Sequence, residues 1–162
     1  MPNVHTHRRA VLRGGLGLAV TGLAAALVGQ PALAASPLVT VYKDPNCGCC
    51  NAWIAHLRDH GFTVTAQNRV DMAAVKDRFA LPVQMRSCHT ATIDGYVIEG
   101  HVPAADIQRL LATKPNALGL AVPGMPVGSP GMEMGGRRDS YRTWLIAPER
   151  VQVFARHPSS EA

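Results

Sequence analysis

The sequence places three of its four cysteines at one point, where their thiol groups could act together. Cys47, Cys49 and Cys50 lie within four residues, and Cys88 stands alone. A thiol–disulfide exchange enzyme needs one thiolate to attack and one to resolve, which leaves a third clustered cysteine without a role. Three clustered thiolates suit a soft ion such as Cu(I). The cluster therefore favours metal binding, with disulfide exchange and structural disulfides as the alternatives.

The residues around this cluster predict a strand followed by a helix. The β-branched run 38–42 is typical of a buried strand, residues 44–46 break it, and residues 52–57 have helical spacing that Gly61 ends. The cysteines of 47–50 then lie at the N-terminus of the helix. Unpaired backbone N–H groups and the helix dipole favour thiolate over thiol at that position.

The remaining elements complete the order β-α-β-α-β-β-α. We predict a strand at 62–66, a helix at 72–79, a hairpin of strands 90–93 and 96–99 with an Asp94-Gly95 turn, and a helix at 104–113 between Pro103 and Pro115. This order is that of a thioredoxin-like α/β single domain, with one sheet and helices on both faces. A long Met/Gly/Pro loop at 122–136 follows, and runs 141–147 and 151–155 predict a short C-terminal β addition.

The segment Ser87-Cys88-His89-Thr90 comes directly before the third predicted strand. Thioredoxin-like enzymes normally carry a cis-proline there, facing the C-x-x-C motif, whereas this chain has Cys88 and His89. The departure weakens an oxidoreductase interpretation, and it places a fourth sulfur and an imidazole against the first three. We interpret Cys88 as a metal ligand, and His89 as either a ligand or a residue that supports one.

Three methionines in the long loop are further candidate ligands: Met125, Met132 and Met134. Thioethers bind Cu(I) and stay available in oxidising compartments, where thiols can be lost to disulfides. Methionine also fills gaps in cores, but a loop this rich in Gly and Pro offers little core to fill. Met85, three residues before Cys88, suits the core and the site equally.

Four further histidines carry weaker signals. His56 and His60 are spaced i, i+4 on the first predicted helix without a third partner, so a solvated helix face is the better interpretation. The sequence identifies no partner for His101 or His157.

Composition and charge exclude some classes of function. The chain has 162 residues, 47% hydrophobic and 17% charged, which predicts one domain with a packed core and excludes a disordered polyelectrolyte. The formal net charge of +5 falls to +2 without Arg8, Arg9 and Arg13, which lie in the N-terminal segment. A nucleic-acid-binding protein would carry a concentrated basic face, so we predict no nucleic-acid partner.

The N-terminal segment predicts export. Residues 1–13 are polar and basic, residues 14–29 are apolar, and residues 32–34 form an A-x-A cleavage pattern. The apolar run is shorter than the stretch of about 20 residues that a membrane-spanning helix needs. Arg8-Arg9 resembles a twin-arginine signal. We predict an export signal peptide at 1–34 and a periplasmic mature domain at 35–162 with no membrane span.

Four separated segments resemble the CopG-like copper-resistance proteins: VYKDPNCGCC (41–50), MRSCHT (85–90), GYVIEGHVP (95–103) and GLAVPGMPVGSPGME (119–133). The resemblance extends over about residues 38–155. It implies a thioredoxin-like fold and copper bound through the sulfurs of C-x-C-C and S-C-H-T, which here are Cys47, Cys49, Cys50 and Cys88. It also implies periplasmic copper handling with Cu(I)/Cu(II) redox activity.

The residues and the resemblance together predict a periplasmic protein that holds Cu(I), with several ions sharing bridging thiolates. Such a protein would lower free copper, contribute to copper resistance and meet other periplasmic copper-handling proteins. The enzyme alternative is a thiol–disulfide oxidoreductase with Cys47 as nucleophile and Cys50 as resolver. The third alternative is a disulfide-stapled scaffold that presents residues 114–140 to a partner.

Overall fold

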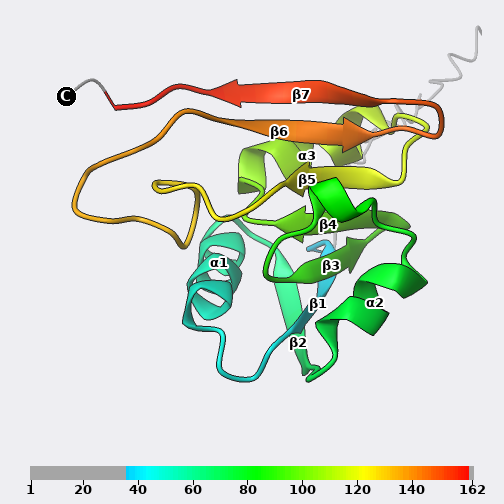
Figure 1. The fold of residues 1–162 in the computed structure, drawn as a ribbon, viewed down its shortest axis with the longest axis horizontal. Helices are drawn as coiled ribbons and strands as arrows, with labels where there is room; N and C mark the ends of the chain where they lie inside the picture. The colour runs from blue at the N-terminus through cyan, green and yellow to red at the C-terminus, as the bar shows by residue number, and fades with distance from the viewer. Residues whose placement is uncertain (1–35, 161–162) are drawn as a thin grey trace, which may run out of the picture. The chain divides into compact units, whose positions relative to one another are not determined.

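The computed structural model describes residues 36–160, so the predicted signal peptide at 1–34 lies outside the described residues. Seven strands form one sheet in the order β2-β1-β3-β4-β5-β6-β7 (Figure 1). The strands are β1 (Leu38–Lys43), β2 (Thr63–Asn68), β3 (Thr90–Ile93), β4 (Tyr96–Gly100), β5 (Gly119–Val122), β6 (Tyr141–Ile146) and β7 (Val151–His157). The helices are α1 (Gly48–Asp59), α2 (Met72–Arg78) and α3 (Ala104–Thr113), with a 3₁₀ turn η1 (Val83–Met85).

The first four strands confirm the predicted thioredoxin-like order. β1 and β2 are parallel, β3 runs antiparallel to β1, and β4 runs antiparallel to β3. Beyond β4 the sheet is extended by β5, which is parallel to β4, and by the antiparallel strands β6 and β7. The predicted C-terminal β addition is therefore present, and it continues the same sheet.

One strand was missed by the sequence analysis, which placed the start of the long loop at Val122. Residues 119–122 form β5, a central strand between β4 and β6. All four of its residues are buried, so no alternation of apolar and polar residues marks it. A run of four is also too short for its periodicity to show a strand.

Two cores lie on opposite faces of the sheet. Val97 and Ile98 are neighbours on β4, and their side chains point to opposite faces because successive side chains alternate along a strand. Ile98 belongs to the larger cluster, which includes Trp53 of α1 and Ile107 of α3. Val97 belongs to a smaller cluster with Leu81, against which Met85 packs. Of its two predicted roles, Met85 therefore has the core role.

The start of α1 lies further toward the N-terminus than the periodic run 52–57 alone indicates. The helix begins at Gly48, so that Cys49 and Cys50 belong to its first turn. This placement confirms that the cysteine cluster is at a helix N-terminus. The short helix α2 is capped in the same sense by Asp71, whose carboxylate accepts the N–H of Ala74 at 2.9 Å.

Two side chains of α1 bond to the backbone at and just before the start of α3. The indole N–H of Trp53 donates to the carbonyl of Val102 at 2.8 Å. The backbone N–H of Ala104 donates to Nε2 of His56 at 3.1 Å. The interpretation of His56 as part of a solvated helix face is therefore wrong, because its ring is half-buried and caps the start of α3. His60 is exposed, as expected for such a face.

His157, for which the sequence identifies no partner, contacts a carboxylate of α3. Nε2 of His157 lies 2.9 Å from Oδ2 of Asp106, which also accepts the hydroxyl of Thr143 at 2.6 Å. The contact joins the end of β7 to α3. Because 51 residues separate the pair, no local pattern in the sequence shows it.

The contact between His56 and Ala104 predicts a pH dependence of stability. Burial, followed by the nearby His60, lowers the pKa of His56 from its usual value, and only a neutral imidazole accepts the Ala104 N–H. The unfolded chain therefore binds a proton at His56 before the folded chain does as pH falls below about 6.5. The free energy of unfolding should decrease in that window and be fully retained above it.

The matched variant is His56→Gln, whose side-chain oxygen accepts the same N–H without titrating. Urea unfolding at about pH 7.5 and about pH 5 should show a smaller loss of stability in the variant than in the parent chain. His89 and His101 are present in both proteins, so the difference between the two losses reports on His56 together with its interaction with His60. Equal losses in the two proteins would show that this contact does not depend on the charge of the ring.

Candidate metal centre

The turn before α1 aims the cysteine cluster. The backbone N–H of Asn46 donates to Oδ1 of Asp44 at 2.8 Å, and the N–H of Cys47 donates to the carbonyl of Asp44 at 3.1 Å. Cys47 is the N-cap residue, and its sulfur accepts the N–H of Cys50 at 3.3 Å. A serine or aspartate usually fills this capping position. Here a sulfur fills it, so the partial positive charge of the helix end acts directly on Cys47.

The structure brings all four cysteine sulfurs together. The Sγ atoms of Cys47, Cys49, Cys50 and Cys88 all lie within 4.8 Å of one another. Cys47 and Cys50 form a disulfide, and Cys49 and Cys88 are free thiols. Sγ of Cys49 lies 3.5 Å from Sγ of Cys47, and Sγ of Cys88 lies 3.7 Å from Sγ of Cys50. Each free thiol therefore contacts one half of the disulfide.

Cys88 is held by a buried ion pair beneath it. The carboxylate of Glu99 is fully buried and accepts the backbone N–H of Ser87 at 2.6 Å and the hydroxyl of Thr90 at 2.6 Å. Lys76 of α2 donates to the same carboxylate at 2.5 Å. Glu99 thus holds the chain on both sides of Cys88. Thioredoxin-like enzymes normally have a proline in this segment, and its ring restricts the backbone. This chain has Cys88 and His89 instead, so the hydrogen bonds to Glu99 hold the backbone conformation.

A glycine permits the close approach that this arrangement needs. Gly100 has φ +71, and a Cβ atom built there would lie 2.6 Å from Cβ of Ser87 and 2.4 Å from the carbonyl oxygen of Val122. Both the backbone conformation and the space therefore require glycine.

His101 is a site residue that the sequence analysis missed. Its Nε2 lies 3.1 Å from Sγ of Cys88, and its Nδ1 lies 2.8 Å from the carbonyl oxygen of Pro130. That carbonyl can only accept, so Nδ1 carries the proton, and the lone pair of Nε2 faces the sulfur. The sequence does contain a signal for this placement. The Asp94-Gly95 turn sets the β3–β4 register, which pairs Thr90 with Glu99 and, continued by two residues, places His101 opposite Cys88.

His89 lies beside the same sulfur from the other side. Its Nδ1 is 3.2 Å from Sγ of Cys88, and its ring is packed between Trp53 and His101, with centroid distances of 4.3 and 4.9 Å. The ring is fully buried, and its Nε2 has no hydrogen-bond partner within the described residues. Burial first, and then His101 and Lys76, hold the pKa of His89 well below its usual value. A neutral ring fits either of its two predicted roles.

With the Cys47–Cys50 disulfide formed, the thiol of Cys88 keeps its proton at neutral pH. Burial, followed by the neighbouring Cys49, raises its pKa to about 12. A cation bound among these sulfurs would act in the opposite direction, since a coordinating thiol is deprotonated by the metal. The group of Cys88, His89 and His101 offers one sulfur and two nitrogens within 4.8 Å of one another. Together with Cys47, the N-cap residue of α1, and with Cys49 and Cys50 of its first turn, it forms a set of soft and intermediate donors that suits Cu(I).

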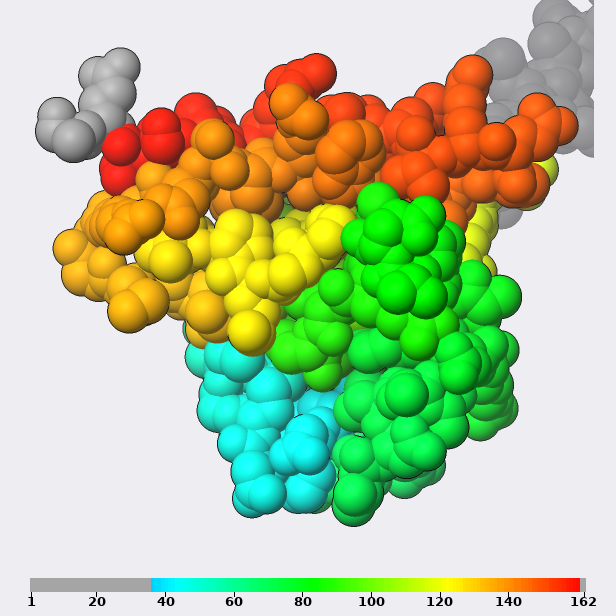
Figure 2. All heavy atoms as spheres, in the orientation of Figure 1, coloured from blue at the N-terminus to red at the C-terminus, as the bar shows by residue number. Residues whose placement is uncertain are grey.

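The long loop lies directly against the cluster. Gly131 is so close to α1 that an added Cβ atom would be 2.8 Å from the carbonyl oxygen of Cys49, and the carbonyl of Pro130 accepts a hydrogen bond from Nδ1–H of His101. Figure 2 shows the yellow and orange loop adjoining the cyan segment that contains α1. Met125 and Met134 are 53% and 62% exposed, and Met132 is half-buried. Their role as ligands stays a prediction.

The buried pair predicts how Cys88 could be released. Glu99→Gln alone would leave Lys76 as an uncompensated buried charge, at a cost of about 3–5 kcal/mol. The informative variants are therefore Lys76→Met/Glu99→Gln and Lys76→Met/Glu99→Leu. Only the Gln variant keeps an acceptor for the Ser87 N–H, so Cys88 should be alkylated fastest in the Leu variant. Mass spectrometry of the labelled peptides gives the rates, and circular dichroism verifies the fold.

An equal alkylation rate of Cys88 in the parent chain and in a folded Leu variant would show that Glu99 does not position this loop. Cys49 serves as the internal reference, because none of the Glu99 hydrogen bonds reaches it.

Comparisons with known proteins show which sequences and structures this chain resembles. A family profile described as "Protein of unknown function, DUF411" matches residues 85–132, from Met85 through Cys88 and His101 to Met132. Among solved structures, "Copper resistance protein copG- Form 2" matches with a TM-score of 0.73 and 49% identity over 76% of this chain and 99% of that chain. "Copper resistance protein copG- Form 1" matches with a TM-score of 0.71 and 51% identity, over 75% and 97% of the two chains. No curated protein matches this chain.

Proposed function

Since the chain belongs to the family of copper resistance protein CopG, we propose that it is a periplasmic protein that binds Cu(I) on its cysteine cluster and contributes to copper resistance. The observation that carries the proposal is the convergence of four sulfurs from two separate segments within 4.8 Å. A structural disulfide needs two sulfurs, and an exchange enzyme needs two. Four sulfurs beside two neutral imidazoles are best explained by a soft metal ion.

The proposed ligands come from both sides of the cluster. Cys47, Cys49 and Cys50 supply sulfur from the N-terminal end of α1, and Cys88 supplies it from the segment before β3. We add His101 to the predicted set, because its Nε2 lone pair faces the Cys88 sulfur at 3.1 Å. His89, Met125, Met132 and Met134 remain candidate ligands. Several Cu(I) ions sharing bridging thiolates would balance the negative charge of four crowded sulfurs.

The disulfide between Cys47 and Cys50 connects this site to electron transfer. Reduction of a disulfide takes up two electrons and yields two thiolates. Oxidation of two Cu(I) to two Cu(II) releases two electrons, so the two half-reactions balance without another reactant. We therefore propose that the cluster can exchange electrons with its copper substrate. The reduced form, with all four thiols free, is the form that holds Cu(I).

The same disulfide supports a second candidate function, thiol–disulfide exchange. Cys47 and Cys50 form an oxidised C-x-x-C pair at a helix N-terminus, where a thiolate leaving group is stabilised. In this candidate function Cys47 is the nucleophile and Cys50 the resolver. The copper proposal explains Cys49 and Cys88 as well, and we therefore prefer it.

Export remains part of the proposal. The resemblance to copper resistance proteins and the pattern of residues 1–34 support a periplasmic location by the twin-arginine route. Among residues 36–160, no helix is long and apolar enough to cross a membrane. Copper ions, and through them other periplasmic copper-handling proteins, are the proposed partners.

Anaerobic Cu(I) titration against a competing chelator tests the copper proposal. The reduced protein should take up Cu(I) tightly, and Cys47→Ser/Cys88→Ser should weaken binding by about a hundredfold or more, because it removes one sulfur from each side of the cluster. Met72→Leu, on α2 and outside the proposed ligand set, is the matched control and should bind as the parent does. Uptake that is unchanged in a folded double-serine variant would disprove the sulfur site.

Insulin reduction with a thiol reductant tests the exchange function separately. An exchange enzyme should lose activity in Cys47→Ser and in Cys50→Ser, while Cys49→Ser keeps it, because only two sulfurs take part in the exchange. We expect little turnover from any of these proteins. Robust activity that depends on Cys47 and Cys50 alone would favour the second candidate.

A further inference from the structure

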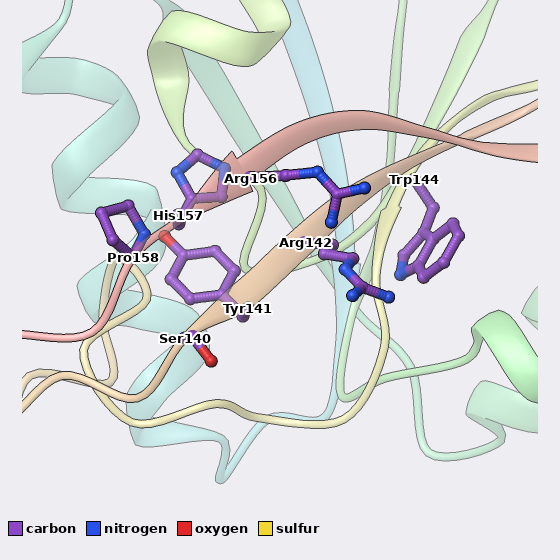
Figure 3. Close-up of a pocket in the computed structure, with 7 residues that line it drawn as sticks. All are labelled: Ser140, Tyr141, Arg142, Trp144, Arg156, His157 and Pro158. Carbon is purple, nitrogen blue, oxygen red and sulfur yellow. The ribbon is translucent and has the colours of Figure 1, made fainter.

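The C-terminal strands line a groove of about 480 Å³ that is separate from the sulfur cluster. Figure 3 shows the groove, with two arginines between the Tyr141–His157 pair on one side and Trp144 on the other. Its residues come from β6, β7 and the positions that flank them. None of them belongs to the two groups of metal-ligating side chains. The groove is therefore a distinct feature of the domain.

Two arginines lie directly opposite each other in this groove. The register of β6 and β7 pairs Arg142 with Arg156, so their side chains leave the same face of the sheet. The hydroxyl of Thr143 faces α3, because it donates to Asp106. Arg142 and Trp144, its neighbours on β6, consequently face away from α3. Like charges placed directly opposite in a sheet are unfavourable, so this pair needs an explanation.

An irregularity in β7 contributes to the arrangement. The register shifts between Thr143 and Trp144, so that Val153 rather than Phe154 pairs with Trp144. The extra residue, Phe154, packs with the core on the α3 side, where Arg109 lies 3.9 Å from its ring centroid. Bulges of this kind re-aim side chains. Here the bulge lets Phe154 join the core while Arg156 faces the groove.

The groove offers hydrogen-bond donors without matching acceptors. Three arginines of the described residues have a carboxylate partner: Arg86 with Asp77, Arg109 with Asp106, and Arg137 with Asp139. Within residues 36–160, the guanidinium groups of Arg142 and Arg156 have no carboxylate partner. The Cζ atom of Arg142 lies 5.7 Å from the ring centroid of Trp144, whose half-exposed indole adds an apolar surface. Two unneutralised guanidinium forks beside an aromatic ring match a planar or tetrahedral oxyanion.

We propose that Arg142 and Arg156 bind an oxyanion, a carboxylate or phosphate group, and that Trp144 covers an apolar or aromatic group attached to it. An oxyanion between the two guanidinium groups removes the repulsion and satisfies their donors. The volume of the groove is in the range of sites for small organic ligands. The site lies outside the sulfur cluster, and its occupancy does not depend on copper.

The indole N–H signal of Trp144 can be used to detect ligand binding in the groove. The chain has two tryptophans, and Trp53 is fully buried with its indole N–H bonded to Val102. In ¹H–¹⁵N spectra of the whole exported domain, the indole signal of Trp144 reports on the groove, and that of Trp53 is the internal reference. Four probes separate the sources of the anion: acetate and benzoate for a carboxylate, inorganic phosphate and phenyl phosphate for a phosphate. The ionic strength is kept constant with chloride.

We expect saturable shifts of the Trp144 signal, tighter binding of the aromatic member of each pair, and a loss of affinity of about tenfold or more in Arg142→Gln and in Arg156→Gln. Arg150→Gln removes the same charge from the turn between the two strands and should bind as the parent does. A preference for benzoate assigns a carboxylate ligand, and a preference for phenyl phosphate assigns a phosphate ligand. Shifts that do not saturate, or that Arg150→Gln reduces as much as the groove variants do, would overturn the proposal.

Discussion

The carboxylate of Glu99 is the group on which the sulfur cluster depends most. It is fully buried, neutralised by Lys76, and bonded on both sides of Cys88. Three of the four cysteines are near one another simply because they are near in sequence. The fourth comes from the segment before β3, the neighbour of β1 in the sheet, and it stays beside them only if that segment has a fixed conformation. Burying an ion pair costs free energy. In return, the backbone is held without a proline, and positions 88 and 89 can carry a thiol and an imidazole.

Much of the fold and part of the site were predictable because local rules determine them. The strand before Cys47, the helix after it and the Asp94-Gly95 hairpin each follow from short patterns, and together they place Cys88 beside the first three cysteines. His101 follows from the same hairpin, since its register places residue 101 opposite residue 88. Spacing along the chain does not show this placement, because residues 88 and 101 are neighbours only across the hairpin.

Other features depend on contacts that no local pattern encodes. β5 carries no alternation because both of its faces are buried. The bonds of His56 to Ala104 and of His157 to Asp106 join residues 48 and 51 positions apart. The Gly and Pro residues of the loop indicate irregular backbone, but they do not show where the loop packs. Two contacts fix its position: the carbonyl of Pro130 accepts a hydrogen bond from His101, and Gly131, which has no side chain, lets the loop approach α1.

The bulge in β7 has a consequence for the behaviour of the domain among other proteins. β7 is the last strand of the sheet, and the outer strand of any sheet is a template on which a second chain can add. An interrupted ladder is a poor template. In addition, Arg109 of α3 donates to the carbonyl of Phe154 at 2.7 Å, which occupies one acceptor that an incoming strand would use. The irregularity therefore makes this edge of the sheet a poor site for edge-to-edge association with a second chain.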